Sequence, residues 1–405
     1  MIDLNFIRDN VEDAKLLFKK RACGVDVDEF LRLQSSLNSK KNEMDLLKFE
    51  QKKSGRDAAA SIKYKVNELK KEVESLEAER DKLWLQMPNL LAFDTPEGKS
   101  DEENVELKRT GDFKRFDFQP QPHEVLGKKL GILDLERGAK VSGSGFYYLI
   151  GAGAELAFAV YSLSYEILRK KGFTFVIPPI FTSRRSFMGT GYFPFEPEQN
   201  YKVEGENLYA IGTSEQTLLA FHDSEILDVN DFPIKYAAVT PCFRTESGSY
   251  GKSSRGAFRV HQFNKMEQII FCLPEDSENW HESCLENIEE LMVALELPYR
   301  VVRVCVGDMG APGYKKYDVE AWFPSFERFR ETHSNTNLLD FQTRRLCIRS
   351  EFNGKKFFPH TISSTMITDR AVLAILENNQ QSDGSIVIPG ALRRFMGGKE
   401  KISVS

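Results

Sequence analysis

The chain has 405 residues, of which 41% are hydrophobic and 28% are charged, a composition typical of soluble globular proteins. Its formal net charge of -5 argues against attraction of nucleic acid to the whole surface, although a local basic patch is compatible with it. The six cysteines form no Cys-x-x-Cys pair, and no apolar run is long enough to cross a bilayer. We therefore expect no zinc, no membrane association and a cytoplasmic location.

Two heptad runs follow the first thirty residues. Apolar residues recur at alternating spacings of three and four over 30–47 and 59–83, with Lys40 and Arg80 as polar interruptions. This spacing is the a/d pattern of a coiled coil. Because Ser54-Gly55 lies between the runs, we predict two long helices that form an antiparallel hairpin.

The distal part of this predicted hairpin is basic. Residues 40–71 contain ten Lys or Arg and five Asp or Glu, a local net charge of +5. Such an excess can contact a phosphate backbone, but mixed charge is also normal on a solvated coiled-coil face. The candidate phosphate-contacting residues of this hairpin are Lys40, Lys41, Lys48, Lys52, Lys53, Arg56, Lys63 and Lys65.

A proline-containing connector over 88–145 precedes a region with both helical and strand patterns. Helices are predicted at 153–171, 277–295 and 371–379, the first of them ended by Gly172. Strand-like runs occupy 173–177, 235–243, 257–263, 267–271, 299–306 and 317–322. Strands in series with few long helices indicate an α+β domain with an antiparallel sheet. The sequence contains neither a P-loop nor a Rossmann fingerprint, so a nucleotide would need another kind of site.

Two of these strand-like runs flank a loop rich in Gly and Ser. The first run ends in Arg244-Thr245-Glu246, and the second carries Val260 and Phe263. Arginine offers a rigid cationic fork to phosphate, a carboxylate can accept from an exocyclic amine, and an aromatic face can stack on a base. One sheet surface could thus hold a nucleotide, although a hairpin with a structural ion pair has the same short signature.

The order of segments in this chain resembles a known family. Residues 248–268, GSYGKSSRGAFRVHQFNKMEQ, are similar to motif 2 of class II aminoacyl-tRNA synthetases in its seryl form. Five further segments resemble the same family: FVIPPIF at 175–181 (motif 1), GTSEQ at 212–216 (serine loop), ETHSNTNLLDFQTRR at 331–345, TISSTMITDRAVLAILENNQQ at 361–381 (motif 3) and IPGALRRFMGGKEKI at 388–402. With the hairpin included, the similarity covers nearly the full chain.

The resemblance implies a class II antiparallel sheet flanked by helices and an N-terminal antiparallel two-helix coiled-coil arm. It places a tRNA-binding domain at 1–105, with the hairpin at about 27–87, and a catalytic domain at 106–405. It implies that ATP activates L-serine to seryl-adenylate, that the seryl group passes to the 3′ end of serine tRNA, and that the protein is a homodimer. Whether selenocysteine tRNA is also a substrate stays open.

The resemblance also assigns roles to individual residues. The implied catalytic residues are Arg244, Glu331 and Arg370. The implied ATP-binding residues are Arg244, Thr245, Glu246, Val260, Phe263, Glu331, Thr332, His333, Ser334 and Arg370. The implied serine-binding residues are Thr213, Ser214, Glu215, Arg244, Glu267 and Thr365, and Mg²⁺ would bind Glu331 and Ser334. Two of these residues have structural alternatives, since Glu267 could form a plain strand ion pair and Thr365 a helix N-cap.

Some positions depart from the usual seryl pattern. Ser214 stands where Ala is usual, His333 where the first Ser of a pair is expected, and Ser363 where motif 3 often has Asn. An active enzyme and a paralogue with weakened or lost aminoacylation, acting as a tRNA- or partner-binding protein, both remain open. A third alternative, a ligase that loads a carrier protein, is disfavoured by the long basic hairpin.

Overall fold

The structure is a computed structural model that describes residues 1–246 and 256–404, with only the backbone at Arg56. The chain divides into two compact units, Met1–Leu90 and Leu91–Ser405. Each unit has a hydrophobic core of its own. Within the described ranges, no helix is long and apolar enough to pass through a lipid bilayer.

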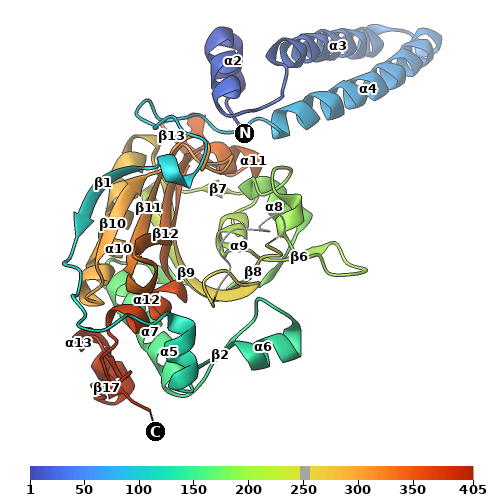
Figure 1. Ribbon diagram of the computed structural model, residues 1–405. Helices are drawn as coiled ribbons and strands as arrows, with labels where there is room; N and C mark the ends of the chain where they lie inside the picture. Colours follow the sequence, from blue (N-terminus) through green and yellow to red (C-terminus); the bar gives the residue numbers. More distant parts are fainter. Residues whose placement is uncertain (247–255, 405) are drawn as a thin grey trace. The chain divides into compact units, whose positions relative to one another are not determined.

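The first unit is helical, and its longest helices form the predicted hairpin (Figure 1). Its helices are α1 (Leu4–Asp9), α2 (Val11–Lys20), α3 (Val27–Lys53) and α4 (Arg56–Leu85). The Asp26 side chain caps α3 by accepting from the backbone N–H groups of Asp28 and Glu29, which satisfies donors that the first turn leaves free. The chain reverses at Ser54-Gly55, as predicted.

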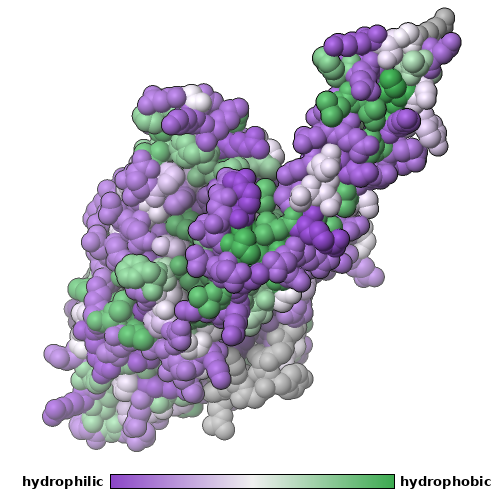
Figure 2. All heavy atoms as spheres, turned by 90° about the horizontal axis from the view of Figure 1, so that it is seen from above, coloured by the Kyte–Doolittle hydropathy of each residue, from purple (hydrophilic) through white to green (hydrophobic). Residues whose placement is uncertain are grey.

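The predicted a/d seam of the hairpin is confirmed. Its most buried members are Phe30, Leu33, Leu37, Leu69 and Val73. The two polar residues that interrupt the apolar pattern bond to the opposite helix. Lys40 pairs with Glu72 at 2.8 Å, and Arg80 donates to Gln34 at 2.6 Å. Early residues of α3 therefore meet late residues of α4, as an antiparallel pair requires. Figure 2 shows apolar side chains of the hairpin lying between hydrophilic ones.

The second unit is built on a largely antiparallel sheet, within the described residues, in the order β1-β10-β11-β12-β15-β9-β8-β4. The strands are β1 (Val105–Thr110), β10 (Tyr299–Arg303), β11 (Lys315–Phe323), β12 (Arg328–Leu339), β15 (His360–Thr368), β9 (Gln262–Cys272), β8 (Ile234–Phe243) and β4 (Thr174–Phe175). Among the described strands of this sheet, β4 and β8 are the pair that runs parallel. The predicted antiparallel sheet flanked by helices is confirmed (Figure 1).

Helices cover both faces of this sheet (Figure 1). Ile270 of β9 packs in the core formed with α7 (Ala152–Lys170), α10 (Ser277–Ala294) and α12 (Arg370–Asn378). Its neighbour Ile269 packs in a separate cluster with α9 (Glu215–Ala220). Because successive residues of a strand point to opposite faces, the odd-numbered residues of β9 define the face on which α9 lies.

Shorter elements complete the second unit. The helices are α5 (His123–Lys129), α6 (Leu135–Ser142), α8 (Arg184–Thr190), α11 (Phe341–Arg345) and α13 (Gly390–Arg393). The strands are β2 (Leu133–Asp134), β3 (Tyr148–Leu149), β5 (Phe181–Ser183), β6 (Leu208–Ala210), β7 (Ile226–Leu227), β13 (Arg349–Phe352), β14 (Lys355–Phe357), β16 (Ile386–Val387) and β17 (Lys401–Ile402).

The structure corrects parts of the sequence prediction. The strand predicted at 257–263 is wrong over its first five residues, since β9 begins at Gln262 and absorbs the run predicted at 267–271. The connector at 88–145 contains β1, α5 and α6, which are too short to give a clear period. The N-cap alternative for Thr365 is wrong, because Thr365 lies inside β15.

Candidate active site

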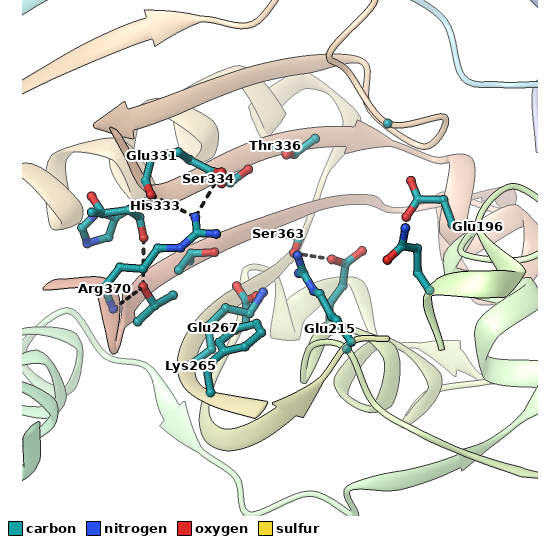
Figure 3. A pocket seen from close by; sticks show the side chains of 18 of the residues that line it. Glu196, Glu215, Lys265, Glu267, Glu331, His333, Ser334, Thr336, Ser363 and Arg370 are labelled. Carbon is teal, nitrogen blue, oxygen red and sulfur yellow. Dashed lines mark hydrogen bonds and ion pairs between the residues drawn. The ribbon is translucent and has the colours of Figure 1, made fainter. Parts of the chain in front are cut away.

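A pocket of about 420 Å³ opens on the face of the sheet that carries α9. Strands β9, β12 and β15 form its floor, and the start of α12 contributes Arg370 (Figure 3). Phe263, Lys265 and Glu267 alternate along β9 and all line the pocket, as residues two apart on one strand should. A concave site with a few converging polar groups is the usual form of a ligand pocket.

Most of the predicted site residues meet in this pocket. Those that line it are Glu215, Arg244, Glu246, Val260, Phe263, Glu267, Glu331, Thr332, His333, Ser334, Thr365 and Arg370. Thr213, Ser214 and Thr245 are not among the lining residues. Thr213 instead donates to Glu267 at 2.7 Å, and the backbone N–H of Thr245 donates to Gln199 at 3.1 Å. Residues 247–255, the loop of the motif 2 segment, lie outside the described residues.

Arg244 and Phe263 form one wall of the pocket. The Arg244 guanidinium carbon lies 5.4 Å from the centroid of the Phe263 ring. The backbone of Arg244 is fixed beyond the end of β8, because its N–H donates to the His261 carbonyl at 3.0 Å and its carbonyl lies 3.0 Å from His261 Nδ1. A fixed cation beside a partly exposed aromatic ring suits a ligand that has both phosphate and base.

Glu331 and Arg370 form an ion pair at the opposite side of the pocket (Figure 3). Arg370 Nη1 donates to the Glu331 carbonyl at 2.9 Å and to Oε2 at 3.2 Å. Burial opposes ionisation of Glu331, but Arg370 and then Lys316 outweigh it and lower its pKa to about 2. Glu331 is therefore an anion at neutral pH. Burial, partly offset by Glu331, lowers the pKa of His333 to about 3 and keeps its imidazole neutral.

One carboxylate oxygen of Glu267, a residue that lines the pocket, has no hydrogen-bond partner among the described residues. The carboxylate is buried, forms a short ion pair with Lys265 and accepts from Thr213 through Oε1. Among the described residues, Oε2 has no hydrogen-bond partner. Buried acceptors are nearly always satisfied, so Oε2 is a candidate acceptor for a donor from a ligand.

Glu215 lies beside Glu267 in a network that the sequence did not predict. It accepts from Gln342 at 2.6 Å and from Tyr192 at 3.2 Å. It also accepts from Ser363 at 2.9 Å (Figure 3). Burial, and then the nearby Glu267 carboxylate, raise the pKa of Glu215 above its ordinary value. Two clustered carboxylates favour a cationic ligand between them.

Lys265 could have been predicted by its two-residue spacing from Glu267. Tyr192 and Gln342 gave no such signal, because they meet Glu215 only through the tertiary fold.

The pocket has oxygen donors that suit Mg²⁺. The Glu331 carboxylate and the Ser334 hydroxyl, both on β12, line the same space. The described part of the chain contains no cluster of three or more His, Cys, Asp or Glu that could hold a metal. Magnesium is commonly held by one or two carboxylates together with substrate phosphates and water, so a donor pair of this kind fits it.

The predicted basic residues of the hairpin differ in their surroundings. Lys40, Lys41 and Lys48 form ion pairs with Glu72, Glu77 and Asp45, in that order. Lys53 lies over the Phe49 ring at 4.0 Å. Lys52, Lys63 and Lys65 are exposed, whereas the Arg56 side chain is outside the described part of the structure.

The sheet, the pocket on it and the Arg370-bearing helix together define a class II aminoacyl-tRNA synthetase core. The family model for the tRNA synthetase class II core domain (G, H, P, S and T) matches residues 199–379. The serine–tRNA ligase of Corynebacterium glutamicum is 40% identical over 98% of this chain and 97% of its own. That of Dictyoglomus thermophilum is 42% identical, over 98% of both chains.

Solved structures of seryl-tRNA synthetases are also similar to this chain. The seryl-tRNA synthetase of Pyrococcus horikoshii complexed with ATP matches with a TM-score of 0.94 and 38% identity, covering 100% of both chains. The cytoplasmic serine–tRNA ligase of Naegleria fowleri in complex with AMP matches with a TM-score of 0.91 and 30% identity, covering 100% of this chain and 99% of its own. The chain belongs to the serine–tRNA ligase family.

Proposed function

We propose that the protein activates L-serine with ATP to seryl-adenylate and then transfers the seryl group to the 3′ end of serine tRNA. The convergence of Arg244, Phe263, Glu267 and Arg370 on one pocket supports this function. Full-length similarity to serine–tRNA ligases, including relatives solved with ATP and AMP, points to the same chemistry.

In the first step, a serine carboxylate oxygen attacks the α-phosphorus of ATP in line, and pyrophosphate leaves. Arg244 binds the α-phosphate and stabilises the charge that develops there. Phe263 stacks on adenine, Glu246 accepts from its amino group, and the backbone of Val260 contacts the nucleotide. Arg370 covers the other face of adenine and neutralises the γ-phosphate, while Thr332 and His333 line the remaining wall.

Serine is held at the other end of the pocket by hydrogen bonds. The free Oε2 of Glu267 accepts from the serine hydroxyl, and Thr365 contacts the same group. Glu215 binds the serine ammonium, and Thr213 keeps Glu267 in place. Such a site rejects amino acids that lack a hydroxyl far better than apolar packing could.

Further residues bind Mg²⁺ and the tRNA. Glu331 and Ser334 hold Mg²⁺, which when bound neutralises charge on the phosphates of ATP. In the second step, a hydroxyl of the 3′-terminal adenosine attacks the seryl carbonyl carbon and AMP leaves. The basic hairpin binds serine tRNA through its backbone and shape.

We further propose a homodimer that works in the cytoplasm. The exposed fractions of Phe158, Ile177 and Phe181 are 75%, 98% and 45%. Ile177 and Phe181 lie in the motif 1 segment and Phe158 lies on α7, and exposed large apolar side chains of this kind are typical of protein interfaces.

Serine-dependent ATP–pyrophosphate exchange, followed by aminoacylation of total tRNA, tests the function. We expect exchange with serine and much weaker exchange with alanine and glycine, which lack a hydroxyl. No exchange at high serine would instead indicate a non-catalytic paralogue. Exchange without transfer to serine tRNA would indicate a different acceptor.

A further inference from the structure

A completely buried histidine lies outside the pocket but touches the chain segment that forms one of its walls. His123 begins α5, and its Nδ1 lies 2.7 Å from Glu377 Oε1. The backbone N–H of Ala257 donates to His123 Nε2 at 3.2 Å. Because a backbone N–H can only donate, Nε2 is the acceptor and Nδ1 carries the proton toward Glu377.

Glu377 ties this histidine to α12. Its carboxylate is fully buried, and Oε1 also accepts from the backbone N–H of His123 at 3.1 Å. Its other oxygen, Oε2, accepts from the backbone N–H and the hydroxyl of Ser325 at 3.2 and 2.6 Å. A buried carboxylate with both oxygens bonded is held in one position, so His123 has a rigid partner on α12.

The same segment contacts α12 a second time, at Arg370. Arg370 Nε donates to the carbonyl of Phe258 at 3.3 Å, and the guanidinium carbon lies 4.4 Å from the Phe258 ring centroid. Residues 370 and 377 are two helical turns apart and so lie on similar sides of α12. Ala257 and Phe258 are therefore attached to one helix at two points, through His123–Glu377 and through Arg370.

Gly256 shows how closely this segment approaches the histidine. A Cβ at Gly256 would lie 2.4 Å from His123 Nε2, and the residue has a φ of +75°. Both features disfavour any other residue at this position. The segment that follows, Phe258 to Val260, lines the pocket.

We propose that His123 and Glu377 are positioning residues for ATP, which hold the pocket wall 258–260 against the helix that carries Arg370. This role rests on the proposed function, because it concerns the same pocket. Neither residue lines the pocket, so both act through the backbone of Ala257.

Two substitutions separate the bonds of His123. In His123→Asn the amide nitrogen can replace Nδ1 as the donor to Glu377, but Ala257 loses its acceptor. In His123→Gln the amide oxygen can reach the place of Nε2 and restore that acceptor. We expect the KM for ATP in serine-dependent exchange to rise about fivefold to tenfold in His123→Asn, the effect of one lost hydrogen bond. We expect it to stay within about twofold of wild type in His123→Gln, because the backbone N–H of residue 123 still donates to Glu377. The KM for serine should be unchanged in both variants.

His222→Asn is the matched control. His222 Nδ1 lies 2.7 Å from Glu225 and Nε2 lies 3.0 Å from the Tyr236 hydroxyl, a similar bonding pattern at residues that do not line the pocket. We expect its KM for ATP to match wild type. Gly256→Ala, which pushes directly on His123, should raise the KM for ATP as His123→Asn does, and it tests the proposal even if His123→Asn fails to fold.

Calorimetric titration with ATP gives the dissociation constant without turnover. We expect the constant to rise by the same factor as the KM in His123→Asn and Gly256→Ala. If the wild type binds ATP but catalyses no exchange, the proposed function fails while this comparison still tests His123. Equal ATP affinity in wild type, His123→Asn and Gly256→Ala would overturn the positioning role, as would an equal loss in His222→Asn.

Discussion

Glu267→Gln tests whether the pocket recognises serine by a charged acceptor. The substitution keeps the size of a buried side chain but removes the charge that pairs with Lys265. It also replaces one carboxylate oxygen by an NH₂ group, which cannot accept from a hydroxyl. A hydrogen bond to a charged group contributes about 1.5–3 kcal/mol, so we expect kcat/KM for serine to fall about 10-fold to 150-fold.

The assay is ATP–pyrophosphate exchange with varied serine at saturating ATP. We expect the KM for ATP to stay within about twofold, because Glu267 lies in the proposed serine site. Thr213→Val is the graded control, since Thr213 donates to Glu267 at 2.7 Å but does not line the pocket. Loss of the Thr213 hydroxyl should lower kcat/KM for serine only about fivefold, the effect of about 1 kcal/mol. An unchanged kcat/KM for serine in Glu267→Gln would refute the reasoning.

Three further predictions concern other groups. Changing the exposed Lys52, Lys63 and Lys65 to Glu should weaken binding of serine tRNA and make the binding less dependent on salt. Filter binding at several salt concentrations measures this, and ATP–pyrophosphate exchange should be unchanged. The pKa of Glu331, about 2 against an ordinary 4.5, means that its ion pair stabilises the fold above about pH 4.5 and loses this effect as the pH falls toward 2. The stability difference between wild type and Glu331→Gln in urea titrations should vanish over that range, starting below about 1 kcal/mol because the side chain is 46% exposed. Ser334→Ala should raise the Mg²⁺ concentration that gives half-maximal exchange, and an unchanged requirement would remove Ser334 from the metal site.

The coiled-coil hairpin was predictable from the sequence because local rules determine it. The apolar residues of a hairpin repeat at a fixed spacing, and a turn dipeptide separates the two runs. The predicted range of about 27–87 therefore matches helices that extend from Val27 to Leu85. No contact with distant parts of the chain is needed to recognise such a pattern.

The site was predictable in its charged residues but not in its supporting network. Arg244, Glu331 and Arg370 belong to motifs that can be read along the chain, and they line one pocket. The partners of Glu215 come from places far apart in sequence, such as Tyr192 and Gln342. Only the folded sheet brings them together, so a single sequence gives no spacing that would identify them.

Two of the strands that the sequence analysis missed, β12 and β15, have the same irregularity. On β12, His333 pairs with Val319 but Glu331 pairs with the next residue, Glu320, so Thr332 is an extra residue in the ladder. On β15 the register shifts in the same way between Thr365 and Ile367.

A β-bulge of this kind changes which side chains face the pocket. In a regular strand, residues three apart point to opposite faces. Here Glu331 and Ser334 both line the pocket, and so do Thr365 and Thr368. The bulges thus place two proposed Mg²⁺ ligands, and then two hydroxyls, on one face. They also break the period-two alternation by which a strand is recognised in sequence. The bulges that shape the site therefore also explain why β12 and β15 were not predicted from the sequence.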